Sequence, residues 1–101
     1  DQPATGRLSR EVRHFPITPE VNIRPDERGQ YYIMSVTAAD RPGLLFGVAQ
    51  TLVNYRINLH TAKIATLGER AEDTFLISGS DLTQDAKVLK IESELLEKLA
   101  I

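Results

Sequence analysis

The passage from Thr37 to Ile64 constrains the fold more than any other part of the chain. A run of strand-forming residues reaches Asp40-Arg41-Pro42-Gly43 and is followed at once by an apolar helical pattern. Apolar residues recur in that pattern at i, i+3, i+4, i+7 and i+8, the spacing of a helix that buries one face. They are Leu45, Val48, Ala49, Leu52 and Val53. The passage therefore predicts a strand, a tight turn and an amphipathic helix in immediate succession.

The remaining segments supply the other strands and a second helix. Val21–Arg24 and Tyr31–Ala38 flank a turn and predict a hairpin, while Ile57–Thr66 and Glu72–Ser78 predict a second one. The last helix is expected from about Asp85 to Lys98. The order ββαββα predicts an α+β sandwich with a four-stranded antiparallel sheet and two helices on one face. This is the split β-α-β arrangement of ferredoxin-like folds.

Composition narrows the class of protein. A chain of 101 residues can bury one core without metal or disulfide staples. Its net charge of −2 argues against the clustered Lys and Arg that bind nucleic acid. The absence of cysteine fits a cytoplasmic origin, and no apolar run reaches the roughly 18 residues that span a bilayer. We therefore expect neither a nucleic-acid partner nor a membrane partner.

The first fifteen residues differ from the rest of the chain. Residues 1–15 are polar with little periodicity, so they are predicted to form a linker between domains. Pro16, Pro19 and Pro25 then keep the following stretch extended, because proline fixes φ. Since the chain begins with Asp1 and not with Met, we expect a segment of a longer protein.

The Asp-Arg-Pro-Gly turn has the chemistry of a ligand loop as well as that of a helix start. Gly43 permits positive φ or close approach of a ligand, and Pro42 gives up a donor that would have no partner. Asp40 could cap the helix, as in an ordinary strand-to-helix turn, or receive a ligand ammonium group. Backbone N–H groups at the positive end of the helix dipole could bind a carboxylate. These groups belong to Gly43, Leu44, Leu45 and Phe46.

Other polar residues carry weaker signals. Asn58 offers a donor and an acceptor suited to an amino acid, but it also fits a simple turn after the helix. His60 has no Cys, Asp or Glu at metal-ligand spacing and is interpreted as a packed or surface histidine. No catalytic motif is present, so catalysis is not expected in this chain. The tip of the second hairpin is expected to be a solvated charged cluster of Glu69, Arg70, Glu72 and Asp73.

The segment Ser35–Gly79 resembles an ACT domain, a small regulatory module attached to many amino-acid-controlled enzymes. More narrowly, Asp40–Leu45, Ile57–Ile64 and Leu67–Phe75 are similar to the C-terminal ACT repeat of a family of bacterial enzymes. Those enzymes add uridylyl groups to the nitrogen-regulatory protein PII and remove them. The resemblance covers about Val21–Ile101. It implies an ACT-type ferredoxin-like sandwich over residues 16–101.

The resemblance implies regulation and not catalysis in this chain. The enzymes it resembles combine a nucleotidyltransferase domain, a uridylyl-removing hydrolase domain and two C-terminal ACT domains that sense glutamine. It implies magnesium in the catalytic domain of such a parent and no cofactor in this chain. The implied partners are glutamine, a neighbouring ACT domain or a second copy of the chain, and PII through the parent enzyme.

The resemblance also implies site residues. ACT domains commonly meet an amino acid at the loop after the first strand and at the start of its helix, often across an interface between two domains. Carried over by position, the first segment is Asp40, Arg41, Pro42, Gly43, Leu44 and Leu45. The second segment, expected opposite the first, is Asn58, Leu59 and His60.

One departure from the family pattern leads to a specific prediction. An ACT domain usually ends with a strand that follows its second helix, whereas this chain is still helical near Leu99. An uncovered edge on the first strand would leave its backbone donors unpaired by protein. We therefore predict that Val21–Arg24 replaces the usual last strand and pairs antiparallel with Tyr31–Ala38.

Two other functions remain open, and a third is disfavoured. The chain could be an ACT-like module for dimerisation or interdomain packing without a ligand. It could be the ACT domain of a guanosine-tetraphosphate synthetase/hydrolase, which fits Asp-Arg-Pro-Gly well and the Gly68-Glu69-Arg70 hairpin less well. RNA-recognition motifs share the β-α-β-β-α-β order but need stacking aromatics on two central strands and a basic face. Only Tyr31 or Tyr32 and one phenylalanine are candidates for that role.

Overall fold

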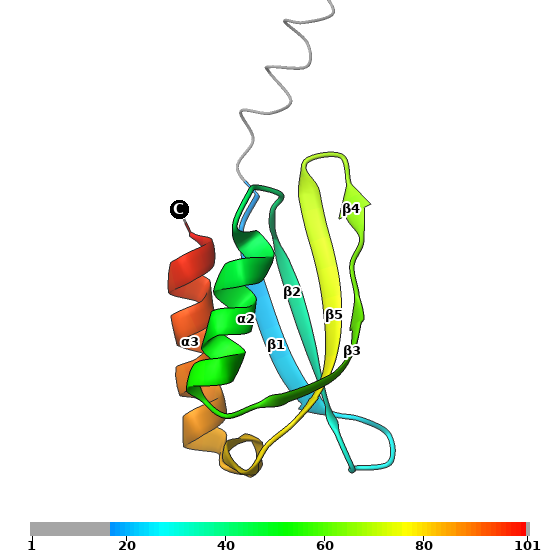
Figure 1. The fold of residues 1–101 in the computed structure, drawn as a ribbon, viewed down its shortest axis with the longest axis vertical. Coiled ribbons are helices and arrows are strands. Elements are labelled where there is room, and N and C mark those ends of the chain that lie inside the picture. Colours follow the sequence, from blue (N-terminus) through cyan, green and yellow to red (C-terminus); the bar gives the residue numbers. More distant parts are fainter. Residues whose placement is uncertain (1–16, 101) are drawn as a thin grey trace, which may run out of the picture.

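Residues 17–100 are described by the structure, a computed structural model of the chain. The linker predicted over residues 1–15 lies outside the described residues and stays a prediction. Two helices pack on one face of an antiparallel sheet (Figure 1), which confirms the predicted α+β sandwich. The elements are β1 (Glu20–Pro25), β2 (Tyr32–Ala39), α2 (Leu44–Asn54), β3 (Asn58–Lys63), β4 (Thr66–Leu67), β5 (Arg70–Ser78), a 3-10 turn η1 (Ser80–Thr83) and α3 (Asp85–Leu99).

The sheet has the order β1-β2-β5-β3, and β4 pairs with β5. Strand β1 pairs antiparallel with β2, with Val21 opposite Val36 and Ile23 opposite Met34. The prediction that this N-terminal strand occupies the edge beside β2 is therefore confirmed. On its outer side, the Ile23 N–H donates to Glu92 Oε2 of α3 at 2.9 Å, which covers part of the new edge.

A polar turn joins β1 to β2 and fixes their register. The Asp26 carboxylate accepts hydrogen bonds from the N–H groups of Gln30 at 3.0 Å and Tyr31 at 3.3 Å. Gly29 supplies the positive φ, 72°, that this turn needs. Because the turn sets the register, it also decides which β1 side chains face the helices.

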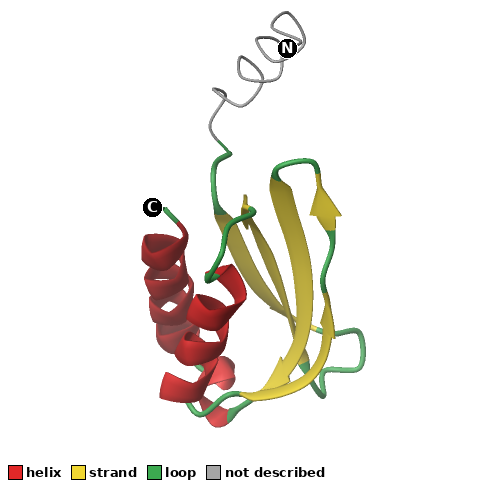
Figure 2. Cartoon of the chain, turned by 45° about the horizontal axis from the view of Figure 1, so that its top comes forward, coloured by secondary structure: helices red, strands yellow, loops and turns green. Residues whose placement is uncertain are grey.

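The sheet and the two helices form two layers (Figure 2), and the buried apolar residues lie between them, as strand alternation and helix spacing require. On the strands, every second residue of β2 and β5 is buried, including Met34, Val36, Phe75 and Ile77. Helix α3 contacts β1, whereas α2 contacts β3 and also packs against α3. The two helices thus divide the sheet between them, and α2 lies over its β3 side.

The buried face of α2 differs from the prediction. Leu44, Val48, Thr51 and Leu52 are buried, whereas Leu45, Ala49 and Val53 of the predicted stripe are exposed. Helical spacing identified two overlapping apolar stripes, and only contact with both the sheet and α3 selects the one that is buried. A second apolar stripe therefore remains on the outside of α2.

The predicted strand Ile57–Thr66 is interrupted, which is why the sheet has five strands and not four. The register of β3 shifts between Leu59 and Thr61, leaving His60 in a bulge. The ladder is interrupted between Lys63 and Thr66, where the Ala65 N–H donates to a side-chain oxygen of Asp73 at 3.2 Å while the Ala65 carbonyl accepts the Glu72 N–H at 2.8 Å. The short strand β4 then resumes the ladder.

Candidate functional site

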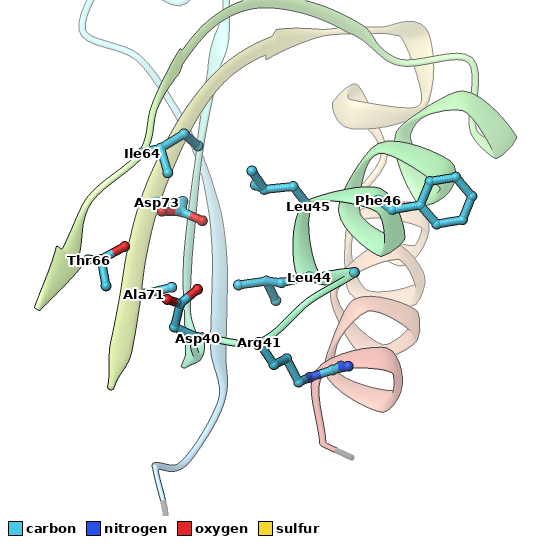
Figure 3. Close-up of a pocket in the computed structure, with 10 residues that line it drawn as sticks. Asp40, Arg41, Leu44, Leu45, Phe46, Ile64, Thr66, Ala71 and Asp73 are labelled. Atoms are coloured by element: carbon cyan, nitrogen blue, oxygen red, sulfur yellow. The ribbon is translucent and has the colours of Figure 1, made fainter. Parts of the chain in front are cut away.

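A pocket of about 240 Å³ lies between the start of α2 and the strands β3 to β5 (Figure 3). One wall comes from the strand-to-helix loop and the first turn of α2. The other comes from the end of β3, β4 and the beginning of β5. Its lining residues are Asp40, Arg41, Gly43, Leu44, Leu45, Phe46, Ile64, Thr66, Ala71 and Asp73.

The strand-to-helix loop leaves the start of α2 without a side-chain cap. Gly43 is the N-cap residue, with φ 85° in the left-handed region, and no side chain caps the helix. The alternative in which Asp40 caps the helix is therefore wrong in this structure; the Asp40 N–H instead donates to the Glu69 carbonyl at 2.8 Å. Among the described residues, the N–H groups of Gly43, Leu45 and Phe46 have no acceptor. They are donors suited to a carboxylate.

Arg41 supports the loop from behind. Its Nη2 donates to the carbonyl oxygen of Lys98, in the last turn of α3, at 2.6 Å. A cation in this position also interacts favourably with the helix dipole. The Arg41 Nε is buried and has no hydrogen-bond partner among the described residues. The guanidinium thus connects the strand-to-helix loop to α3 and is directed away from the carboxylates of the pocket (Figure 3).

Asp73 is the charged residue of the pocket that the sequence interpretation did not assign to the site; Ile64, Thr66 and Ala71 were not assigned to it either. Asp73 is only 2% exposed, and burial raises the pKa of its carboxyl, with the Asp40 charge raising it further and the Ala65 N–H opposing the shift. The prediction of a solvated tip is right for Arg70 and Glu72, which form an exposed ion pair at 3.3 Å, and wrong for Asp73. The signal was its position two residues before Phe75, on the same face of β5.

The structure separates the two predicted site segments. Five residues of the first segment line the pocket, and Pro42, which is exposed, does not. In the second segment, Asn58 pairs with Ser78, at the end of β5 far from the pocket. Since Ala39 pairs with Arg70 and Asn58 with Ser78, the length of β5 places Asp40 and Asn58 roughly 25 Å apart. None of the second segment, Asn58, Leu59 and His60, lines the pocket.

His60 makes contacts of its own. Its Nε2 is hydrogen-bonded to Ser78 Oγ at 2.7 Å, and its ring lies 4.5 Å, centroid to centroid, from that of Tyr31. By strand alternation, Ser78 lies on the sheet face opposite the helices. Any shared role of the two segments in one site requires a second domain, and that role stays a prediction.

The pocket offers binding chemistry. The described residues contain no group of three or more His, Asp or Glu placed to hold a metal ion. The pocket does contain donors for an anion at the start of α2, carboxylates for a cation at Asp40 and Asp73, and apolar walls from Leu44, Leu45 and Ile64. A small zwitterion such as an amino acid matches all three features. Among the described helices, none is both long and apolar enough to cross a membrane.

Fold and pocket together define a small ligand-binding α+β domain, and comparison with known proteins gives its family. The family model described as "ACT domain" matches residues 32–97. The chain therefore belongs to the ACT domain family, whose members are regulatory domains. No solved structure matches the chain.

The chain is also similar to a small part of three larger proteins, each described as a bifunctional uridylyltransferase/uridylyl-removing enzyme. It is 67% identical over 101 residues to that of Aromatoleum aromaticum, covering 100% of this chain and 12% of the relative. It is 58% identical over 101 residues to that of Ralstonia nicotianae, covering 99% and 12%. For Nitrosospira multiformis the identity is 55% over 97 residues, covering 96% and 11%. The chain thus spans about 12% of the length of these relatives.

Proposed function

We propose that this chain is a glutamine-responsive regulatory domain of a cytoplasmic uridylyltransferase/uridylyl-removing enzyme that acts on PII. The observation that carries the proposal is the pocket at Asp40–Leu45, whose polar groups match an amino acid zwitterion. The similarity to the bifunctional enzymes supports the choice of parent. Catalysis, and any magnesium that it uses, would belong to other domains of that enzyme.

The ligand would be held at both of its charged ends. Its carboxylate would accept hydrogen bonds from the open first turn of α2, and its ammonium group would face the carboxylates of the pocket. The aliphatic part of glutamine would pack against Leu44, Leu45 and Ile64. A volume of about 240 Å³ suits one small ligand of this kind, since sites for drug-sized molecules are commonly larger.

A neighbouring ACT domain, or a second copy of this chain, would complete the site. Support comes from apolar side chains left exposed beside the pocket and along α2. On α2, Leu45 is 45% exposed and Val53 is 73% exposed. Ile64, between β3 and β4, is 48% exposed, and Leu67 of β4 is 59% exposed. In the sheet of the described residues, β3 is an edge strand. An edge strand beside an apolar helix stripe is a surface on which a second domain of the same fold can dock.

Regulation would follow from this shared site. If glutamine binds one arrangement of the paired ACT domains more tightly than another, it shifts the population toward that arrangement. We propose that the favoured arrangement promotes removal of uridylyl groups from PII. The coupling would be no larger than the difference in glutamine affinity between the two arrangements.

Isothermal titration tests the proposal. Glutamine is titrated into the 101-residue chain and into the full-length enzyme that carries it, with glutamate and alanine as controls. We expect saturable, glutamine-selective heat in the full-length enzyme, and a parallel shift of activity on PII toward uridylyl removal. No heat from either protein would exclude glutamine as the direct ligand. It would favour the alternative that the exposed apolar stripe serves domain packing alone.

A further inference from the structure

We propose that Asp73, and not Asp40, is the residue that holds the ammonium group of the amino acid ligand. The inference rests on the proposed function and deepens it, because it assigns the depth and orientation of the ligand in the pocket. It also defines the ligand class: a molecule must carry a protonated amine in order to bind with full affinity.

The first argument is the burial of Asp73 without a cation. It occupies the helix-facing row of β5 between Ala71 and Phe75 and is 2% exposed. No Lys or Arg of the described residues forms an ion pair with it. A buried carboxylate without a cation is costly, and a neutral side chain could accept the same hydrogen bond from Ala65. The contacts of the folded chain therefore do not explain why position 73 carries a charged side chain.

The second argument is the direction of the carboxylate. One oxygen, Oδ1, accepts the Ala65 N–H at 3.2 Å, and no hydrogen bond among the described residues uses the other oxygen. Figure 3 shows the Asp73 side chain directed from β5 toward the start of α2, across the pocket. The facing walls include the apolar side chains of Leu44 and Leu45. In such surroundings an ion pair with an entering ammonium group is stronger than it would be in water.

The third argument compares Asp73 with the other charges at the pocket. Asp40 is exposed, so water screens its attraction for a cation. The cation that lines the pocket, Arg41, donates to the Lys98 carbonyl, and no hydrogen bond among the described residues joins it to either carboxylate. An ammonium group from outside is therefore the partner that Asp73 lacks. With that group placed deep in the pocket, the ligand carboxylate would lie toward the N–H groups at the start of α2.

The test replaces the charge and keeps the hydrogen bond. Asp73→Asn in the full-length enzyme can still accept the Ala65 N–H. The matched control is Glu72→Gln, which removes the same charge one residue away, on the other face of β5. By titration calorimetry we expect Asp73→Asn to weaken glutamine binding roughly 10- to 100-fold. We expect Glu72→Gln to leave binding unchanged and Asp40→Asn to weaken it less than Asp73→Asn does.

A second measurement removes the amine from the ligand, in wild type and in Asp73→Asn. The probe is 4-carbamoylbutanoate, which is glutamine without its amine. We expect it to bind the wild-type enzyme at least tenfold more weakly than glutamine, and to bind Asp73→Asn no more weakly than it binds the wild type. Thermal melting without ligand checks that the variants fold.

The outcomes separate the two proposals. Equal binding of glutamine by wild type and Asp73→Asn, or equal binding of glutamine and 4-carbamoylbutanoate by wild type, would overturn the role of Asp73 and leave the amino acid site standing. Absence of glutamine binding by the wild-type enzyme would overturn both proposals.

Discussion

Two glycines near the start of α2 show how one residue type meets opposite backbone demands. Gly43 has φ 85° and open space where a Cβ would lie, so an alanine there would suffer backbone strain without a clash. Gly47 lies within the helix, also with open space, where alanine is the better helix former. We expect Gly43→Ala to lower the free energy of unfolding by about 1 kcal/mol and Gly47→Ala to raise it by about 0.5 kcal/mol. Urea denaturation measures both, and shifts of the same sign would contradict the assigned geometry.

The buried carboxylate of Asp73 predicts a dependence of stability on pH. Its pKa in the folded chain is raised above the ordinary value of 3.8, chiefly by burial. The folded state therefore binds this proton more tightly than the unfolded state does. The stabilisation is complete below pH 3.8 and is lost as the pH rises through the raised pKa. Asp40 contributes to the raised pKa, and the Ala65 hydrogen bond opposes it.

Asp73→Asn should remove this dependence. We expect the free energy of unfolding of the variant, relative to wild type, to increase as the pH rises above 3.8 and then to level off. Urea titrations of both proteins at a series of pH values measure the difference. A difference that stays constant over that range would show that the Asp73 pKa is the same in the folded and unfolded chains.

Individual residues of the site were predictable only where local chemistry fixes them. Gly43 was predicted because a strand that turns at once into a helix needs positive φ or close approach, and the observed φ is 85°. Asp73 was not predicted, because it stands in a run of charged residues that indicated a solvated tip. That indication is right for Arg70 and Glu72, which form an exposed pair. The burial of Asp73 depends on α2 covering that face of the sheet, which is a tertiary contact and not a sequence pattern.

At the scale of elements, β1 shows how an edge position is filled and covered. The Ile23 N–H on its outer side donates to the Glu92 carboxylate of α3 at 2.9 Å. Removing the acceptor in Glu92→Ala should cost about 1 kcal/mol and speed the hydrogen exchange of the Ile23 amide. The control is Glu97→Ala, an exposed position of the same helix. Unchanged exchange at Ile23 in Glu92→Ala would mean that the carboxylate does not protect the edge.

Element order was predictable, but element faces and interruptions were not. Hydrophobic period and turn residues give β1, β2, α2, β5 and α3 with bounds close to those observed. The buried face of α2 was misassigned because Leu45 and Val53 form an equally good stripe with Ala49. At the interruption between β3 and β4, the Asp73 side chain accepts the hydrogen bond of the Ala65 N–H. The sequence of β3 itself contains no pattern that predicts this side-chain hydrogen bond.

At the scale of the whole molecule, the outer stripe of α2 predicts how this chain meets a second ACT domain. Val53 is 73% exposed and does not line the pocket, so a substitution there tests the surface apart from the ligand contacts. Val53→Glu would place a charge on an apolar surface that the proposed partner covers, and desolvating that charge is costly. Leu89 on α3, which is 63% exposed, is the matched control, because α3 packs over β1 and not over the β3 side of the sheet.

We expect Val53→Glu to leave the stability of the 101-residue chain within about 0.5 kcal/mol of wild type, since the site is exposed. In the full-length enzyme it should weaken glutamine binding about tenfold or more, because the paired arrangement that completes the site becomes less populated. Leu89→Glu should alter neither property. Calorimetry of glutamine binding and sedimentation velocity of the isolated chain are the measurements. Normal glutamine binding by Val53→Glu, or a loss of binding in Leu89→Glu alone, would place the partner on another face of the molecule.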